Sequence, residues 1–332
     1  MSTQNRQTNS DSLPPTGILI ANIGTPAAPT PEAIQAFLAQ FLADPFVIDY
    51  PRWLWLPILH GIILHVRPRR SARNYQRIWT DAGSPLLFGT QNLAFKLQTT
   101  LAAQLETPLH VTVGMRYGQP SITTALQQLR EQGCERLLVL PLFPQYSGTT
   151  TGTILAAVDA ELKTWASPPA LTIIRDYHDH SAYIQSLAAQ IRLQMVPGMK
   201  ILFSFHGIPR RYGEVGDPYE SQCQRTASLL AVELDLKPEV WSLAYQSRFG
   251  PEAWLTPYTD EELIRYGSMG LPLLNTVCPG FAVDCLETLG EIANEGAQTF
   301  REAGGGRLNY IPALNDGKAQ GEMLSKIILE HL

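Results

Sequence analysis

Short apolar runs alternate along this chain with longer stretches in which apolar residues recur at helical spacing. The apolar runs predict strands at 17–24, 109–118 and 136–143 in the first half and at 171–177, 200–207, 240–247 and 272–279 in the second. Several runs are continuously hydrophobic, which is typical of parallel strands buried on both faces. Helical patterns separate them, at 31–42, 121–133 and 281–296. The pattern therefore predicts an α/β protein with parallel sheets flanked by helices.

The strand and helix pattern occurs twice, and a Ser-Pro-Pro sequence at 167–169 separates the two occurrences. A single core rarely serves as many as 332 residues, so we expect two similar domains, at 15–168 and 169–332. Residues 1–14 are polar and contain no apolar segment, which predicts a disordered tail rather than a signal peptide.

Composition excludes some classes of partner. The formal net charge of −5 leaves no basic excess to neutralise phosphates, so no nucleic acid is expected. The four cysteines form no CxxC pair, which indicates reduced thiols and a cytoplasmic protein. The sequence also lacks GxGxxG after its first strand and GxxxxGK[ST] anywhere, which weighs against a dehydrogenase or an ATPase.

His206 ends the predicted strand 200–207 and is followed by Gly207. The ordinary alternative is a histidine whose ring nitrogens bond neighbouring backbone. In open α/β sheets, however, ligands bind beyond the carboxyl ends of the strands. A neutral imidazole at that place can accept a proton or bind a metal near neutral pH, so His206 is a candidate for either role.

Three carboxylates, Asp284, Glu287 and Glu291, fall at i, i+3 and i+7 of the predicted helix 281–296. This spacing places them on one helix face. A solvated acidic face is the usual outcome of such a row. Because this helix follows directly after strand 272–279, its first turns border the expected crevice, and the row is also a candidate path for a divalent cation or protons.

The segment 53–66 is apolar, but it is shorter than the roughly 20 residues of a spanning helix and is interrupted by Pro57 and Gly61. A buried core helix is one interpretation. Two tryptophans and the arginines that follow favour an exposed apolar lip that contacts a membrane or a large flat ligand. The next segment, 74–87, combines aromatic residues with a Gly-Ser-Pro turn and is weak evidence alone.

Six segments in order resemble the ferrochelatase family, which inserts ferrous iron into protoporphyrin IX to form haem. They are YQRIWTDAGSPL (75–86), GMRYGQPSI (114–122), PLFPQYSGTTTG (141–152), KILFSFHGIPRRY (200–212), LAYQSRFGPEAWLTPYTDE (243–261) and NTVCPGFAVDCLETLGEI (275–292). The resemblance implies two Rossmann-like domains around a porphyrin cleft, and it makes a lyase of haem biosynthesis the expected function.

The resemblance also implies roles for individual residues. His206 and Glu287 match the catalytic pair and contact the iron, whereas Glu291 and Asp284 match the acidic line that leads away from the cleft. The implied porphyrin contacts are Tyr75, Ser84, Pro85, Leu86, Arg116, Tyr117, Tyr245 and Gln246. The lip 53–66 matches a hydrophobic segment thought to face the membrane.

The chain departs from animal and fungal members at two places. Cys285 replaces the histidine of their DHIETL motif, and Gly148 stands where an early cluster ligand would be, so no [2Fe–2S] cluster and no other cofactor is expected. The partners expected are protoporphyrin IX and Fe²⁺, with peripheral membrane contact and a monomeric state. Two alternatives remain: a coproporphyrin or cobalt chelatase of the same fold, or a carrier that binds porphyrin without catalysis.

Overall fold

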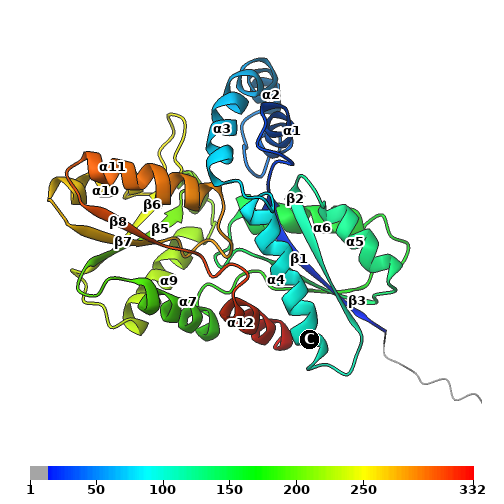
Figure 1. The fold of residues 1–332 in the computed structure, drawn as a ribbon. Helices are drawn as coiled ribbons and strands as arrows, with labels where there is room; N and C mark the ends of the chain where they lie inside the picture. The colour runs from blue at the N-terminus through cyan, green and yellow to red at the C-terminus, as the bar shows by residue number, and fades with distance from the viewer. Residues whose placement is uncertain (1–13) are drawn as a thin grey trace, which may run out of the picture.

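Two parallel sheets, each of four strands, organise residues 14–332, which are the residues that the computed structural model describes. The strand order is β2-β1-β3-β4 in the first sheet and β6-β5-β7-β8 in the second, so the two sheets have the same topology. The sheets lie side by side with helices around them (Figure 1). The predicted α/β class and the two similar halves are confirmed. The predicted tail at 1–14 falls almost entirely outside the described residues.

The first half contains both of the predicted helices 31–42 and 121–133. Its elements are β1 (Thr16–Gly24), α1 (Pro31–Phe41), α2 (Arg52–Ile58), the π-helix η1 (Leu59–Ile63), α3 (Leu64–Ile78), α4 (Pro85–Ala102), β2 (Leu109–Tyr117), α5 (Ile122–Glu131), β3 (Arg136–Pro141), the π-helix η2 (Gly148–Gly152), α6 (Thr153–Leu162) and β4 (Ala170–Ile173).

The second half repeats the alternation of strands and helices. Its elements are α7 (Ser181–Gln194), β5 (Lys200–His206), α8 (Arg210–Glu214), α9 (Tyr219–Glu233), β6 (Trp241–Gln246), α10 (Thr259–Ser268), β7 (Leu273–Val277), the π-helix η3 (Leu286–Gly296), α11 (Ala297–Glu302), β8 (Arg307–Ile311) and α12 (Lys318–Leu329).

Local sequence signals explain where the predicted helices begin. The Thr30 side chain accepts a hydrogen bond from the Ala33 amide, and Pro31 occupies the first position of α1, where its missing N–H costs nothing. Ser121 caps α5 in the same way by accepting from the Thr124 amide at 3.0 Å. The central strand β1 is buried along nearly its whole length, as its continuous apolar run predicts.

One hydrophobic core extends through both halves. Ile18, Ile20 and Leu140 of the first sheet belong to the same buried cluster as Phe203 and Phe205 of the second. Helices α4, α7, α9 and α12 contribute to this cluster, whereas α5 and α6 cover the other face of the first sheet and α10 and α11 the other face of the second. The halves therefore share apolar packing and are not joined by a linker alone.

The predicted boundary at 168 does not separate the sheets. Strand β4 lies after it, yet β4 pairs with β3 of the first sheet, so the placement of a strand at 171–177 in the second half was wrong. The C-terminal helix α12 also packs against both α4 and α7, as Figure 1 shows. Proline at 168 and 169 marks only the turn between α6 and β4, where such residues are common.

The apolar segment 53–66 is helical and half exposed. Trp55 and Leu59 are buried against α1 and α3, whereas Trp53 is 79% exposed, Ile62 59% and Val66 69%. Helices α1, α2 and α3 stand together at the top of the molecule in Figure 1. We call the exposed side chains Trp53, Leu54, Ile58, Ile62 and Val66 the apolar lip.

Candidate active site

His206 is the last residue of β5, an interior strand of the second sheet, and pairs in parallel register with Gln246 of β6. Its Nδ1 lies 2.6 Å from the carbonyl oxygen of Gly207. A carbonyl oxygen only accepts hydrogen bonds, so Nδ1 carries the proton, and in the neutral ring the lone pair is on Nε2. A backbone contact of this kind is the usual way in which proteins orient a metal-binding or basic imidazole.

The acidic segment that follows β7 forms a π-helix, not the α-helix predicted at 281–296. The helix η3 begins at Leu286, because Cys285 is extended (φ −148°, ψ −167°). The Cys285 amide donates to the Thr288 hydroxyl at 3.0 Å and the Cys285 side chain in turn accepts from the Thr288 amide, which closes a capping box. Glu287 therefore lies in the first turn of η3.

Gln246, on the edge strand β6, connects the start of η3 to the interior strand β5. Its Nε2 donates to the carbonyl oxygen of Glu287 at 2.7 Å, and its Oε1 accepts from the Ser204 hydroxyl of β5 at 2.7 Å. Gln246 is 3% exposed, so these bonds are shielded from water. The role of Gln246 in porphyrin contact stays a prediction; in the structure its amide positions Glu287.

Glu291 lies one π-helical turn beyond Glu287 and binds Ser247. The Ser247 amide donates to Glu291 Oε1 at 2.6 Å, and the Ser247 hydroxyl donates to Oε2. Ser247 has a φ of 68°, a conformation that is uncommon for a residue with a side chain and that tends to occur at functional sites. Ser247 ends the predicted strand 240–247, but it was not among the predicted site residues, because its left-handed backbone and its bonds to Glu291 leave no signal in the sequence.

His206 and Glu287 both act electrostatically on Glu291, although His206 is far from the two glutamates in the sequence. Burial raises the pKa of Glu291; the Ser247 bond and the His206 ring oppose this shift, and Glu287 adds to it. A carboxyl group buried beside a second carboxyl group and an imidazole is the kind of arrangement that proteins use to hold and move protons. His206 pairs with Gln246, and Gln246 and Ser247 bind Glu287 and Glu291, so the structure brings these three predicted residues together.

Residues of the first half of the chain also lie close to Glu287. Helix α3 packs against η3, and the charge of Glu287 contributes to raising the pKa of the Tyr75 hydroxyl, after the larger effect of burial. The pKa of Arg67 is lowered by burial and raised by Glu287, so Arg67 also lies near this carboxylate. Tyr75 is thus close to Glu287, and its contact with a porphyrin stays a prediction.

Asp284 does not share a helix face with Glu287 and Glu291, so this part of the prediction was wrong. It precedes η3, is 6% exposed and is held by hydrogen bonds on both oxygens. Its donors are the Thr288 hydroxyl at 2.9 Å, the Tyr310 hydroxyl at 2.5 Å, the Asn315 amide group at 2.8 Å and the Ala313 amide at 3.4 Å. Asp284 fastens the start of η3 to the segment after β8.

Arg116 and Tyr117, at the end of β2, are tied to a buried carboxylate. The guanidinium of Arg116 forms an ion pair with Asp44, and the Tyr117 hydroxyl donates to Asp44 at 2.8 Å. The Thr153 hydroxyl donates to the same oxygen at 2.7 Å. Tyr117 is 1% exposed and Arg116 is partly exposed, so only Arg116 presents charged atoms to a ligand. Asp44 was not among the predicted residues.

The remaining predicted porphyrin contacts are mostly buried. Ser84 begins α4 and its hydroxyl lies 2.9 Å from that of Thr25, Pro85 is the first residue of the helix, and Leu86 belongs to the shared core. Tyr245 is 1% exposed, burial raises the pKa of its phenol, and its hydroxyl has no hydrogen-bond partner in the protein. Porphyrin contact by these residues stays a prediction.

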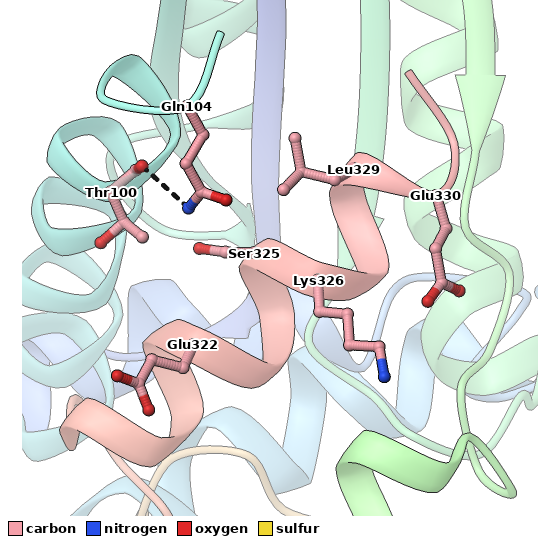
Figure 2. A pocket seen from close by; sticks show the side chains of 7 residues that line it. All are labelled: Thr100, Gln104, Glu322, Ser325, Lys326, Leu329 and Glu330. Carbon is pink, nitrogen blue, oxygen red and sulfur yellow. Dashed lines mark hydrogen bonds between the residues drawn. The ribbon is translucent and has the colours of Figure 1, made fainter.

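A hollow on the surface lies away from the predicted site residues. A hollow between α4 and α12 is lined by seven residues, none of which is a predicted site residue (Figure 2). Within residues 14–332, no three or more His, Cys, Asp and Glu side chains gather as a metal-binding group. In the same residues, every helix is too short or too polar to cross a lipid bilayer.

Comparison with solved structures defines the class of protein. SirB from Bacillus subtilis with Fe³⁺ covers 95% of this chain and 95% of its own, with a TM-score of 0.55 and 11% identity. The sirohydrochlorin chelatase SirB from Bacillus subtilis subspecies spizizenii, in complex with cobalt, covers 95% and 94%, with a TM-score of 0.55 and 9% identity. The chain thus has the two-domain, Rossmann-like chelatase fold.

Sequence comparison then identifies the family. A family model described as Ferrochelatase matches residues 15–332. The ferrochelatase of Nitrosococcus oceani is 49% identical over 325 residues, which is 97% of this chain and 88% of the relative. Ferrochelatase 1 of Shewanella oneidensis is 45% identical and covers 96% of each chain. The chain belongs to the ferrochelatase family and is a porphyrin metal chelatase, a lyase that inserts iron into a porphyrin for haem synthesis.

Proposed function

We propose that the chain inserts Fe²⁺ into protoporphyrin IX, with His206 on one side of the metal and Glu287 and Glu291 as the acidic route that serves it. The observation that carries this assignment is the approach of these three residues, which come from the end of β5 and from η3. The porphyrin is proposed to contact Tyr75, Arg116 and the neighbouring segments.

The reaction replaces two pyrrole N–H protons with one Fe²⁺, so two protons leave and no electron is transferred. His206 is suited to accept a pyrrole proton at Nε2, because its Nδ1 proton is held by the Gly207 carbonyl oxygen. The same lone pair can instead ligate the arriving iron, and both roles need the neutral ring.

Glu287 is proposed to act as the oxygen ligand or proton acceptor nearest to the ring, and Glu291 as the next acceptor. The raised pKa of Glu291 favours a carboxyl group that takes up and releases a proton closer to neutrality than an exposed glutamate does. Asp284 is proposed to act indirectly, by fixing the position of η3.

Substrate strain is proposed to come from the walls of the site. Insertion requires the flat macrocycle to bend so that its nitrogen lone pairs point at the metal. A rigid wall of buried side chains can supply a strain of roughly 1–5 kcal/mol from binding energy elsewhere on the ring. Tyr75 and Leu86, which are buried, are proposed to form part of such a wall.

Three further points belong to this proposal. The apolar lip is proposed to rest on a membrane surface, because five large apolar side chains are exposed on neighbouring turns. The protein is proposed to lack an iron–sulfur cluster, since the family position of one ligand is Gly148. It is proposed to act in the cytoplasm as a monomer.

The test is anaerobic insertion of Fe²⁺ and Zn²⁺ into protoporphyrin IX by the wild-type protein, His206→Ala and Glu287→Gln. Both variants are expected to bind porphyrin and to lose metallation. Retention of a tenth of wild-type turnover by His206→Ala contradicts its assignment. Comparison of turnover on protoporphyrin IX and coproporphyrin III tests the choice of substrate, and bound porphyrin without any metallated product indicates a carrier.

A further inference from the structure

A charged cluster joins the two halves close to the apolar lip. Arg211 of α8 bonds Asp49 through both terminal nitrogens of its guanidinium and bonds Glu252 through Nε. Asp49 belongs to the first half, immediately before α2, whereas Arg211 and Glu252 belong to the second half. We call these three residues the Arg211 clamp.

Two tyrosines complete the cluster. The Tyr50 hydroxyl donates to Glu252 at 3.3 Å, and the Tyr212 hydroxyl donates to Asp49 at 3.3 Å. The Arg211 guanidinium also lies 4.7 Å from the ring centre of Tyr212 and 5.9 Å from that of Tyr50. Every hydrogen bond between Arg211 and Asp49, and between Tyr50 and Glu252, crosses from one half to the other.

The geometry of the contact makes it stronger than an ordinary surface ion pair. Two parallel N–H bonds from a guanidinium to one carboxylate fix the orientation of both groups. The side chain of Arg211 is 37% exposed, that of Asp49 39% and that of Glu252 24%, so the cluster is partly shielded. The hydrogen bonds and the charge of Arg211 hold the pKa of Asp49 below its usual value, so this pair stays ionised at a lower pH than an isolated aspartate would.

The clamp connects two segments that border the proposed porphyrin site. Arg211 lies five residues after His206, in the short helix α8 that follows β5. Asp49 lies four residues before Trp53, the first side chain of the apolar lip. A change in the distance between Asp49 and Arg211 therefore changes the spacing between the lip and the segment that follows His206.

We infer that the Arg211 clamp holds the apolar lip against α8, just after His206, and thereby slows the exchange of porphyrin between the site and its surroundings. Arg211 is in this sense a positioning residue: it acts through the lip and takes no part in the transfer of protons or metal. The inference rests on the proposed function only in that porphyrin binds beside His206.

The test measures protoporphyrin IX dissociation by stopped-flow fluorescence, with Zn²⁺ insertion followed separately in a single turnover. The proteins are the full-length wild type, Arg211→Ala, Asp49→Asn and the double variant. Loss of the clamp is expected to accelerate dissociation about two- to five-fold, the range that partly exposed ion pairs support. Single-turnover insertion is expected to stay within about two-fold of wild type. The double variant is expected to resemble each single variant, because all three lack the same contact.

The salt dependence of porphyrin dissociation is a second measurement. It would not differ between the wild type and Arg211→Ala if Arg211 only supported the fold. Exposed charges are screened within roughly 8–10 Å at moderate ionic strength, so added salt is expected to accelerate dissociation from the wild type and to do so less in Arg211→Ala. The matched control is Lys96→Ala, which removes another ion pair between the halves, Lys96 with Asp316, away from the clamp residues. It is expected to keep the wild-type rate and salt dependence.

Two results would overturn the inference. One is an unchanged dissociation rate in both Arg211→Ala and Asp49→Asn, and the other is additive effects of the two substitutions. If Arg211→Ala fails to fold, the inference is tested with Asp49→Asn and Arg211→Lys instead. Arg211→Lys keeps the positive charge but loses the paired hydrogen bonds. Failure of the proposed function is recognised independently, because it appears as metallation by His206→Ala.

Discussion

At the scale of single residues, the site depends on side chains that hold other side chains. Gln246 and Ser247 at the end of β6 bind the backbone of Glu287 and the carboxylate of Glu291. The segment that includes Gln246 was recognisable from the sequence because it follows a predicted strand. The bonds that these residues make were not, since they depend on the approach of η3, whose residues lie 41 and 44 positions further along the chain.

Substitution of Asp284 distinguishes a structural role of this residue from a role in proton transfer. Asp284→Ala leaves the Thr288 hydroxyl, the Tyr310 hydroxyl and the Asn315 amide without their acceptor, so we expect the free energy of unfolding to fall by about 2–4 kcal/mol. Urea unfolding measures this change, and Glu287→Gln is the control that should alter it little. Unchanged stability combined with lost turnover would mean that Asp284 itself carries protons.

The raised pKa of Glu291 predicts a dependence of stability on pH. Its folded-state pKa lies above the ordinary 4.5, so the folded protein holds this proton more tightly than the unfolded chain. The resulting stabilisation is complete below the ordinary pKa and is lost as the pH rises through the folded-state value. The Glu291→Gln variant has no titrating group at this position, so it does not lose stability in this way as the pH rises. We therefore expect the free energy of unfolding of Glu291→Gln, minus that of the wild type, to increase between about pH 4 and about pH 8.

Urea titrations of both proteins across this pH range measure that difference. A difference that stays flat or decreases would show that burial does not disfavour the Glu291 carboxylate. Ser247→Ala serves as the control for the hydrogen bond, since it removes the hydroxyl that binds Glu291 and retains the titrating group.

At the scale of elements, the apolar runs predicted seven strands, and each of them is present with ends shifted by a few residues. The strand β8 escaped detection because its sequence, RLNYI, is short and half polar. The prediction of a helix at 281–296 was wrong for its first turn. The Asp284 amide bonds Asn315 outside the helix and the Cys285 amide bonds the Thr288 side chain, and apolar periodicity reports neither these bonds nor the change to a π-helix.

The apolar lip predicts binding to lipid. Trp53→Ser with Ile62→Ser removes two exposed apolar side chains, so we expect affinity for anionic lipid vesicles to fall about ten-fold or more while stability stays unchanged. Vesicle co-sedimentation measures the affinity. Phe95→Ser is a matched control, because Phe95 is 74% exposed but lies on α4. Equal losses of vesicle affinity in the lip variant and in Phe95→Ser would show that the lip is not the lipid-binding surface.

At the scale of the whole molecule, periodicity and turn residues predicted two similar halves but not how they are joined. The Ser-Pro-Pro sequence suggested a boundary that the hydrogen bonds of β4 do not respect. Which sheet accepts a short strand depends on register and packing with distant segments, and these leave no mark at a single position. The shared core and the helix α12 were likewise invisible to local patterns.

The shared core predicts cooperative unfolding. Leu324 on α12 is fully buried in the cluster that contains strands of both sheets, so Leu324→Ala is expected to cost about 2–5 kcal/mol. The unfolding curve should stay a single transition that moves as a whole. Tryptophan fluorescence and circular dichroism in urea measure it. Two transitions, with only one displaced by the substitution, would contradict the shared core.

The placement of β4 has a practical consequence for anyone who divides the gene. A break after codon 168 would leave the edge of β3 uncovered in the first fragment, and exposed edges of this kind promote aggregation. A break near codon 178 keeps that sheet whole, but α12 would still be synthesised on the other fragment from α4. Fragments cut there should therefore become soluble and active only when both are produced in the same cell.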